Sequence, residues 1–302
     1  MDTTVRTGLI VGLSAYMIWG FFPIYFKTLQ SVPADMLLAH RIFWSVPTAI
    51  VLIFAARKWD AVWRVLKDKK MMLTLLASGM VIGLNWLVYI WAVQNERVIE
   101  ASLGYYMNPL VSFLFAAIFF SERFSKVQMI AMVLAGIGVI NQTVVVGVFP
   151  WVGLTVCFSF AAYGAIRKTT AIDSRVGFIF EVVLLMPLAL AYLVWNWSHG
   201  APALAPTTGL SALLILSGVV TAAPLILFAM ATRRVKLSTV AIMQFLTPTL
   251  QLCLGLWYGE PFTPAHAVTF GFIWSGVALF VFAGSVAERK RRLSEKKIPA
   301  AT

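Results

Sequence analysis

Long apolar runs alternate with short polar connections along the whole chain. About 20 consecutive apolar residues cross a bilayer as an α-helix, and the runs predict about ten such spans. The fifth and sixth spans meet with almost no polar connection, so their boundary is the least clearly marked. The predicted spans are residues 7–27, 36–56, 72–94, 99–120, 127–146, 150–165, 176–195, 209–232, 237–258 and 266–286.

The connection between the second and third spans has a pattern of its own. Trp59, Val62, Trp63 and Leu66 recur at helical spacing, with basic residues between them. A short helix with one apolar and one basic face is typical of a segment that lies in the membrane interface. We therefore predict an interfacial helix there.

Two distant stretches, residues 100–124 and 238–262, share a pattern. Both are largely apolar, both place a polar residue before a proline near the middle, and both end in glutamate followed two positions later by phenylalanine. The matched residues are Asn108-Pro109 with Thr247-Pro248, Glu122 with Glu260, and Phe124 with Phe262. This similarity indicates one unit used twice.

The duplication predicts the organisation of the chain. Each half holds about five spans, and an odd number of spans inserts the second copy upside down relative to the first. The predicted parts are a first repeat at residues 1–146, a second and inverted repeat at 147–287, and a basic tail at 288–302. The predicted fold is an all-α integral membrane protein with ten transmembrane helices in two inverted five-helix repeats.

Composition agrees with a membrane protein. The chain is 60% hydrophobic and 12% charged, whereas soluble domains have about 45–50% apolar and about 25% charged residues. The two cysteines, Cys157 and Cys253, fall within apolar runs, so we expect buried free thiols. No nucleotide-binding or metal-binding motif occurs, so we expect no cofactor, no metal and no enzymatic activity.

The positive charge is distributed unevenly. The net charge is +12, and with the N-terminus in the cytoplasm 21 of the 24 Lys and Arg residues fall on the inner side. This asymmetry predicts a multi-pass membrane protein with both termini cytoplasmic. The basic residues are then expected to face anionic lipid, and no nucleic-acid partner is predicted.

Polar and amphipathic side chains at membrane depth are the candidates for a substrate site. An amide in hydrocarbon is costly unless it faces protein or water. Aromatic residues also form interfacial belts, which is the alternative explanation for several of them. The predicted substrate-binding residues are Trp19, Asn85, Trp86, Tyr89, Tyr105, Asn108, Tyr163, Gln244 and Thr247.

The paired prolines are predicted hinges. Proline removes a backbone hydrogen bond and kinks or breaks a helix, and broken helices at matching places in two repeats point to a transporter site. Pro109 and Pro248 occupy such places. Tolerated structural kinks are the alternative.

Charged residues inside spans suggest gates. Arg41 lies near the outer end of the second span. Glu181 lies equally far into the seventh span, which places it near the inner end because the second repeat is inverted. We predict an outer pair of Arg41 with Glu100 and an inner pair of Glu181 with Lys236. The alternative is that both charges only extend to the nearest interface.

The repeated motif resembles the EamA repeat of the drug/metabolite transporter superfamily. The stretch 83–110 resembles the RarD group within it, and the likeness covers nearly all of the chain except the tail. It implies ten spans in two inverted halves, a central cavity and a small-solute permease with alternating access.

The functional prediction is a secondary transporter of a small metabolite or drug-like solute, acting as a monomer or homodimer. A non-transporting receptor or scaffold and a lipid-translocating protein are the alternatives. A duplicated inverted unit favours transport, because such symmetry creates two related states around one site. Substrate, direction and ion coupling are not encoded in a recognisable motif.

Overall fold

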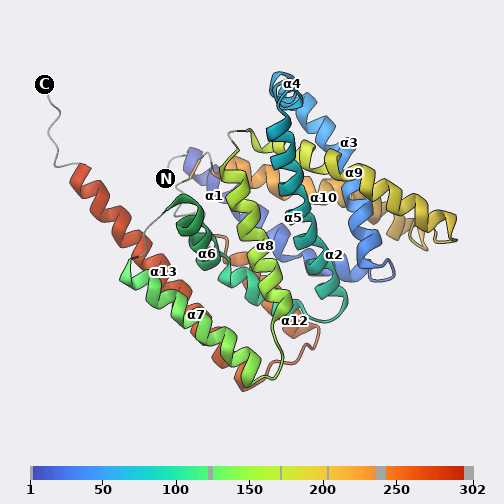
Figure 1. The fold of residues 1–302 in the computed structure, drawn as a ribbon. Coiled ribbons are helices and arrows are strands. Elements are labelled where there is room, and N and C mark those ends of the chain that lie inside the picture. Colours follow the sequence, from blue (N-terminus) through green and yellow to red (C-terminus); the bar gives the residue numbers. More distant parts are fainter. Residues whose placement is uncertain are drawn as a thin grey trace, which may run out of the picture.

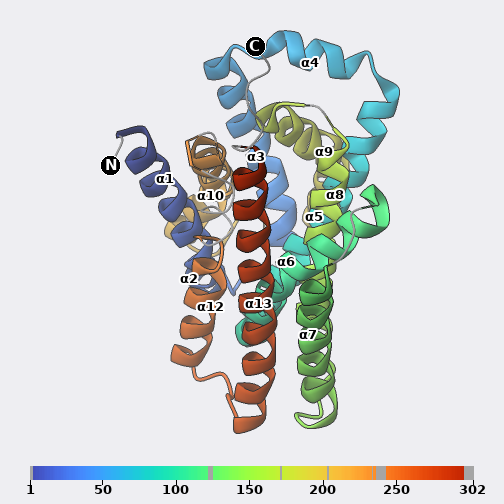
Figure 2. The ribbon, with the colours of Figure 1, turned by 90° about the vertical axis from the view of Figure 1, so that its left-hand side faces the viewer.

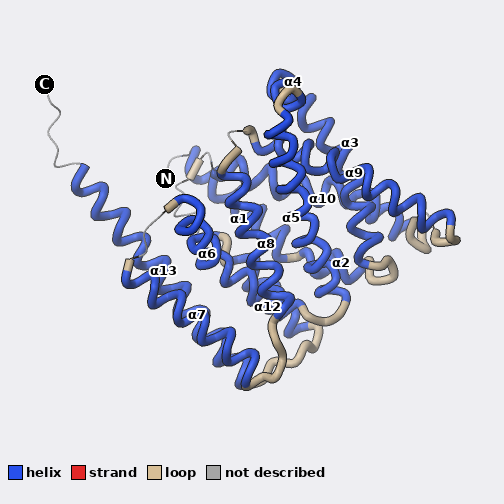
Figure 3. The backbone as a smooth tube through the Cα atoms, viewed as in Figure 1, coloured by secondary structure: helices blue, strands red, loops and turns tan. Residues whose placement is uncertain are grey.

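The computed structural model describes residues 3–121, 125–170, 172–202, 204–232, 234–235 and 243–295, and every regular element within them is a helix (Figures 1 and 3). The first half contains α1 Thr3–Gly20, α2 Phe22–Thr28, α3 Ala34–Ala56, α4 Trp59–Leu66, α5 Lys69–Gln94, α6 Val98–Phe120 and α7 Lys126–Val144. The second half contains α8 Trp151–Lys168, α9 Ser174–Ser198, α10 Thr208–Thr232, α12 Leu246–Trp257 and α13 Pro264–Glu295.

The helices pack mostly across the two halves of the chain. Helix α7 lies along α13 at one edge of the molecule, and α3 packs against both α9 and α10 at the other (Figures 1 and 2). Helix α8 contacts both α5 and α6 between these edges, and α1 contacts α10 and α12. The sequence halves are therefore interleaved in space.

Large apolar side chains cover much of the outer surface. Phe54, Trp195 and Trp257 are among many that are exposed, and a soluble monomer rarely shows so much contiguous apolar surface. Within the described residues, eight helical segments are long and apolar enough to cross a membrane. The chain thus has the helical membrane-protein character that the hydropathy pattern predicts.

The predicted count of ten spans is only partly reproduced. Helices α8 and α12 occupy the predicted sixth and ninth spans, but neither meets the length and hydropathy expected of a crossing segment. Helix α12 has 12 residues, and α8 has 18 residues with Arg167 and Lys168 in its last turn. The ten-span count and the inverted repeat therefore stay predictions.

The matched prolines behave differently in the two halves. Helix α6 runs without interruption through Pro109, so a broken helix at Asn108-Pro109 is not found in this structure. Helix α12 begins at Leu246, which places Pro248 in its first turn. Proline is tolerated there because the first backbone N–H groups of a helix have no intrahelical acceptor.

Two smaller expectations have mixed outcomes. A short helix is confirmed at Trp59–Leu66, and α4 lies across one end of the molecule with Trp59 and Trp63 exposed (Figure 2). Both cysteines are free, and Cys157 is buried as expected. Cys253 is exposed instead, because an apolar stretch of a membrane helix also includes residues on its outer surface.

Candidate functional site

Arg41 is the central residue of the candidate site. It lies on α3 among packed helices, and only 4% of its surface is exposed. Its Nε donates a hydrogen bond of 2.7 Å to Oγ1 of Thr221 on α10. The guanidinium also lies over the ring of Trp86 on α5, 4.3 Å from the ring centre. Helices from both halves of the chain therefore fix this side chain.

Aromatic side chains surround the guanidinium. Phe22 and Phe26 on α2 lie 5.6 and 5.5 Å from it, measured to the ring centres. The tyrosines Tyr25, Tyr89 and Tyr105 are close enough to interact with its charge. The rings of Tyr89 and Tyr105 contact each other edge-on at 5.6 Å. Aromatic faces are favourable neighbours for a cation.

The predicted contact between Arg41 and Glu100 is not formed. Glu100 pairs with Arg97 at 2.9 Å and accepts a hydrogen bond of 2.8 Å from the backbone N–H of Val152. The carboxylate therefore caps the first turn of α8, where unpaired N–H groups favour negative charge. Among the described residues, no carboxylate forms an ion pair with Arg41.

Glu181 on α9, the predicted counterpart of Arg41, has a different environment. It is 3% exposed and accepts hydrogen bonds from Ser78 at 2.6 Å and Tyr163 at 3.4 Å. Nε of Arg167 lies 3.6 Å from the carboxylate. The predicted partner Lys236 lies outside the described residues. Glu181 thus has a countercharge from α8, at a residue just beyond the predicted sixth span of residues 150–165.

One end of the helix bundle, which the predicted topology places outside and which we call the outer end, is held by polar contacts. The Glu260 carboxylate accepts hydrogen bonds of 2.7 Å from the backbone N–H groups of Val98 and Ile99. Lys27 lies over the ring of Tyr258, 4.4 Å from its centre. These contacts join the first half to the α12–α13 connection. Burial raises the pKa of Glu260, although these N–H groups act in the opposite direction.

The structure divides the predicted substrate-binding residues into separate groups. Trp86, Tyr89 and Tyr105 gather around Arg41. Asn85 instead donates hydrogen bonds to Val156 and Ser159, which joins α5 to α8. Tyr163 belongs to the Glu181 group.

The remaining predicted residues make local or packing contacts. Thr247 donates to the carbonyl of Tyr16, and Trp19 contacts the rings of Tyr16 and Phe228. Asn108 accepts a hydrogen bond from Ser112 on the same helix. Gln244 lies in the turn before α12 and is partly buried.

Comparison with known proteins identifies the family. A model of the EamA-like transporter family matches residues 6–141. The uncharacterized transporter YojE of Bacillus subtilis (strain 168) is 41% identical over 281 residues, 92% of this chain and 94% of that protein. Protein RarD of Escherichia coli (strain K12) is 39% identical over 288 residues, 94% of this chain and 97% of that protein. The chain belongs to the EamA-like transporter family.

Further matches place the chain near the RarD proteins of this family. The chloramphenicol-sensitive protein RarD of Pseudomonas aeruginosa is 29% identical over 277 residues, 90% of this chain and 92% of that protein. A solved crystal structure with 16% identity aligns over 92% of this chain and 98% of that one with a TM-score of 0.60. That structure supports the fold alone. As an EamA-family member, the chain is a multi-pass protein of the bacterial inner membrane.

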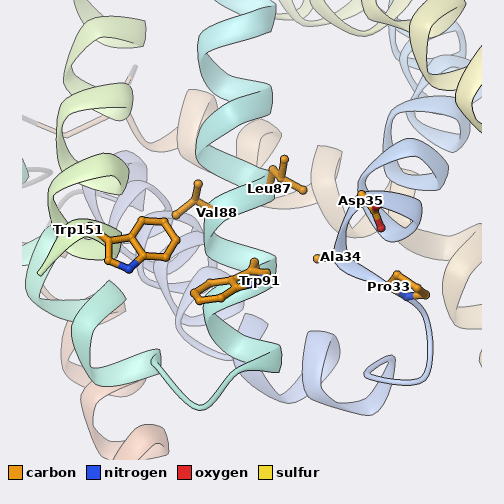
Figure 4. Close-up of a pocket in the computed structure, with 7 residues that line it drawn as sticks. All are labelled: Pro33, Ala34, Asp35, Leu87, Val88, Trp91 and Trp151. Carbon is orange, nitrogen blue, oxygen red and sulfur yellow. The ribbon is translucent and has the colours of Figure 1, made fainter.

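Two cavities lie near the outer end. One, of about 430 Å³, lies between α3 and α5 and is lined by Trp91, Trp151 and Asp35 among others (Figure 4). The other, of about 330 Å³, is lined by His40, Tyr192 and the 201–206 connection among others. None of the predicted substrate-binding residues lines either cavity. In this EamA-family structure the Arg41 group is closely packed.

Several residues of these groups escaped the sequence analysis. Thr221 and Ser78 are small hydroxyl residues within apolar runs, and nothing in their neighbourhood marks them. Gln251 carried a usable signal, because it is an amide at membrane depth. Its Nε2 donates to the carbonyl of Trp19, and its side chain faces the Tyr89 hydroxyl.

Proposed function

We propose that this EamA-family chain is a secondary transporter that moves a small metabolite or drug-like solute across the bacterial inner membrane by alternating access. In this proposal the two halves, residues 1–146 and 147–287, are inverted repeats, and both termini are cytoplasmic. The protein acts as a monomer or homodimer. The closed arrangement at the outer end then corresponds to one of the two states of the cycle.

Reciprocal contacts between the halves are the observation that carries this proposal. Arg41 on α3 hydrogen-bonds a hydroxyl on α10, and Glu181 on α9 hydrogen-bonds a hydroxyl on α5. The backbones repeat the pattern. A side chain at Gly79 would meet the backbone of Glu181, and one at Gly218 would meet the backbone of Trp44. Two inverted copies would form the same contacts twice, as this pattern suggests.

The alternatives gain less support. A non-transporting receptor or scaffold has no need for charged residues buried at matched depths in two halves, and the relatives belong to a transporter family. The same membership argues against an enzyme. One relative is named for chloramphenicol sensitivity, so chloramphenicol is a reasonable member of a solute panel.

Cross-linking can test whether the outer contacts must separate during transport. Purified protein in liposomes, with Cys157 and Cys253 replaced by alanine, would carry the pair Lys27→Cys and Tyr258→Cys, which joins the two halves. A short bifunctional thiol reagent should abolish saturable solute exchange in this variant. Exchange would be followed with a panel of labelled metabolites and drugs, including chloramphenicol.

A cross-link within one half is the matched control. Val32 and Gln94 are already in contact through a hydrogen bond from Gln94 to the Val32 carbonyl, and both lie in the first half. Cysteines at these two positions should cross-link with less effect on exchange. Full exchange with the halves cross-linked would reject alternating access at this joint. Flux equal to that of empty liposomes for the whole panel would reject transport.

A further inference from the structure

The charge of Arg41 is balanced by no acidic residue within the part of the chain that the structure describes. An isolated buried charge is costly, and inside a membrane such a residue usually has a partner or marks a site. We propose that Arg41 and the aromatic side chains around it bind a small organic monocarboxylate. This inference rests on the proposed transport function, since the bound anion is then the transported solute.

The orientation of the guanidinium leaves one edge for a ligand. Its Nε is engaged by Thr221, and one face is covered by Trp86. The structure gives Arg41 no other hydrogen bond to a described residue. The two terminal nitrogens therefore remain as parallel donors, and this fork matches the two oxygens of a carboxylate.

Charge balance favours a ligand with a single negative charge. Only one cation stands in this group of residues, and its hydrogen-bond partner Thr221 is neutral. A monoanion would neutralise the site, whereas a dianion would leave one uncompensated negative charge among buried helices. A phosphate ester is therefore a poorer fit than a carboxylate.

Two further polar groups lie beside Arg41. The hydroxyl of Tyr89, a residue only 3% exposed, faces the side-chain amide of Gln251, which is 1% exposed. A ligand with its own polar atoms would meet both groups next to the guanidinium.

The surroundings also suggest the rest of the ligand. Phe26, Tyr89 and Tyr105 form a continuous series of edge-to-face ring contacts beside the guanidinium. Aromatic surfaces of this kind accommodate apolar or aromatic groups. The proposed ligand is thus a carboxylate with an apolar or aromatic body. Because the rings are closely packed in this conformation, entry requires the opening that the transport cycle provides.

Binding to purified protein is the direct test. Benzoate and phenylacetate are compared with their neutral amides, with phenylphosphonate as a dianion, with chloride and with chloramphenicol. Binding is measured by tryptophan emission and by the shift in Tm. We expect the carboxylates to bind at least about tenfold more tightly than the amides, because the amides lack the charge that pairs with Arg41.

Variants assign the binding to Arg41. Arg41→Gln should abolish the preference for carboxylates, and Arg41→Lys should weaken binding about tenfold because the charge stays while the fork is lost. Tyr89→Phe, a conservative change that preserves the packing, should weaken it severalfold. Arg175→Gln is the control, since Arg175 is paired with Asp173 outside this group of residues and its loss should leave binding unchanged.

The outcomes separate this inference from the transport proposal. Equal affinity for carboxylates and amides, or carboxylate binding that survives Arg41→Gln, would overturn the assignment. Tighter binding of phenylphosphonate, or binding of chloride alone, would overturn it as well. Saturable flux of a neutral solute without carboxylate binding would reject this inference and keep transport. Carboxylate binding without any flux would keep this inference and reject transport.

Discussion

Arg41 and Glu181 lie at positions that the proposed repeat makes equivalent, yet their surroundings differ in kind. Glu181 has a cation, Arg167, and two hydroxyl groups. Arg41 has one hydroxyl and several aromatic rings, but no carboxylate among the described residues. Both are nearly fully buried. The two charges therefore share burial, but they differ in how the charge is compensated.

This difference suggests a division of roles. A buried charge with a countercharge is costly to disturb, because removing one partner leaves the other charge buried and unpaired. A buried charge without a countercharge stabilises the fold little and is free to recognise an anion. The Glu181 group would then be structural, and the Arg41 group would serve the ligand.

The largest expected effect tests this division through stability. Arg167→Met leaves Glu181 without its cation and should lower the free energy of unfolding by about 3 kcal/mol. Arg41→Met removes a charge that no acidic residue compensates in the described part of the chain, so it should change the free energy of unfolding by less than about 1 kcal/mol or raise it. Thermal unfolding of the purified variants measures both.

A double variant checks the cause. Glu181→Gln added to Arg167→Met removes the unpaired charge while an amide can still accept the hydrogen bonds of Ser78 and Tyr163, so most of the lost stability should return. Equal losses of unfolding free energy for Arg167→Met and Arg41→Met would contradict the proposed difference, because both charges would then be equally compensated.

The prolines extend the comparison to helix geometry, and their expected effect on transport is smaller. Pro248→Ala allows α12 to extend toward the preceding turn, and it should slow solute exchange about tenfold, equivalent to 1.4 kcal/mol. Pro109→Ala, within the continuous helix α6, should slow it about threefold. Folded yield and Tm should change less than the rate.

Proline inside a helix of each half supplies the control. Pro47 lies within α3 and Pro187 within α9, and alanine at either position should change the exchange rate less than twofold. If Pro47→Ala and Pro187→Ala slow exchange as much as Pro248→Ala does, the matched prolines are ordinary kinks and not hinges.

Much of the fold could be predicted from the sequence, because apolar run length and proline position act locally. The hydropathy pattern predicted the helical ranges, including the short helix at Trp59–Leu66. It could not predict that α6 would continue through Pro109 while α12 starts just before Pro248. Such outcomes depend on neighbouring helices that supply or withhold contacts.

The site was predictable in part for the same reason. Trp86, Tyr89 and Tyr105 could be recognised as polar-edged aromatics at membrane depth, and they do surround Arg41. Sequence gives the depth of a charge but not the rotation of its helix. The sequence therefore suggested Glu100 as the partner of Arg41, although Glu100 pairs with Arg97. It also placed Arg167 beyond the end of the sixth span, although Arg167 pairs with Glu181.

The smallest expected effect concerns the joint between the halves at the outer end. Burial raises the pKa of Glu260 in the closed arrangement, and opening would return it toward the ordinary value. A proton therefore binds more tightly to the closed form. Closure should strengthen as the pH falls through the raised pKa, and this added stability should be lost as the pH rises above it.

Thiol labelling can follow this change. With Cys157 and Cys253 replaced by alanine, a cysteine at Val98, which is buried beneath the Glu260 carboxylate, should react with an impermeant reagent more slowly at pH about 5 than at pH about 7. The rate is divided by that of a cysteine at the exposed Gln30, which removes the pH dependence of the thiol itself. We expect this corrected rate to be about two to five times higher at pH about 7 than at pH about 5, which corresponds to less than about 1 kcal/mol.

In Glu260→Gln, whose amide does not titrate, the corrected rate should be the same at both pH values. A pH dependence that persists in Glu260→Gln would assign the effect to another titrating group and reject Glu260 as the pH-sensitive residue of this joint.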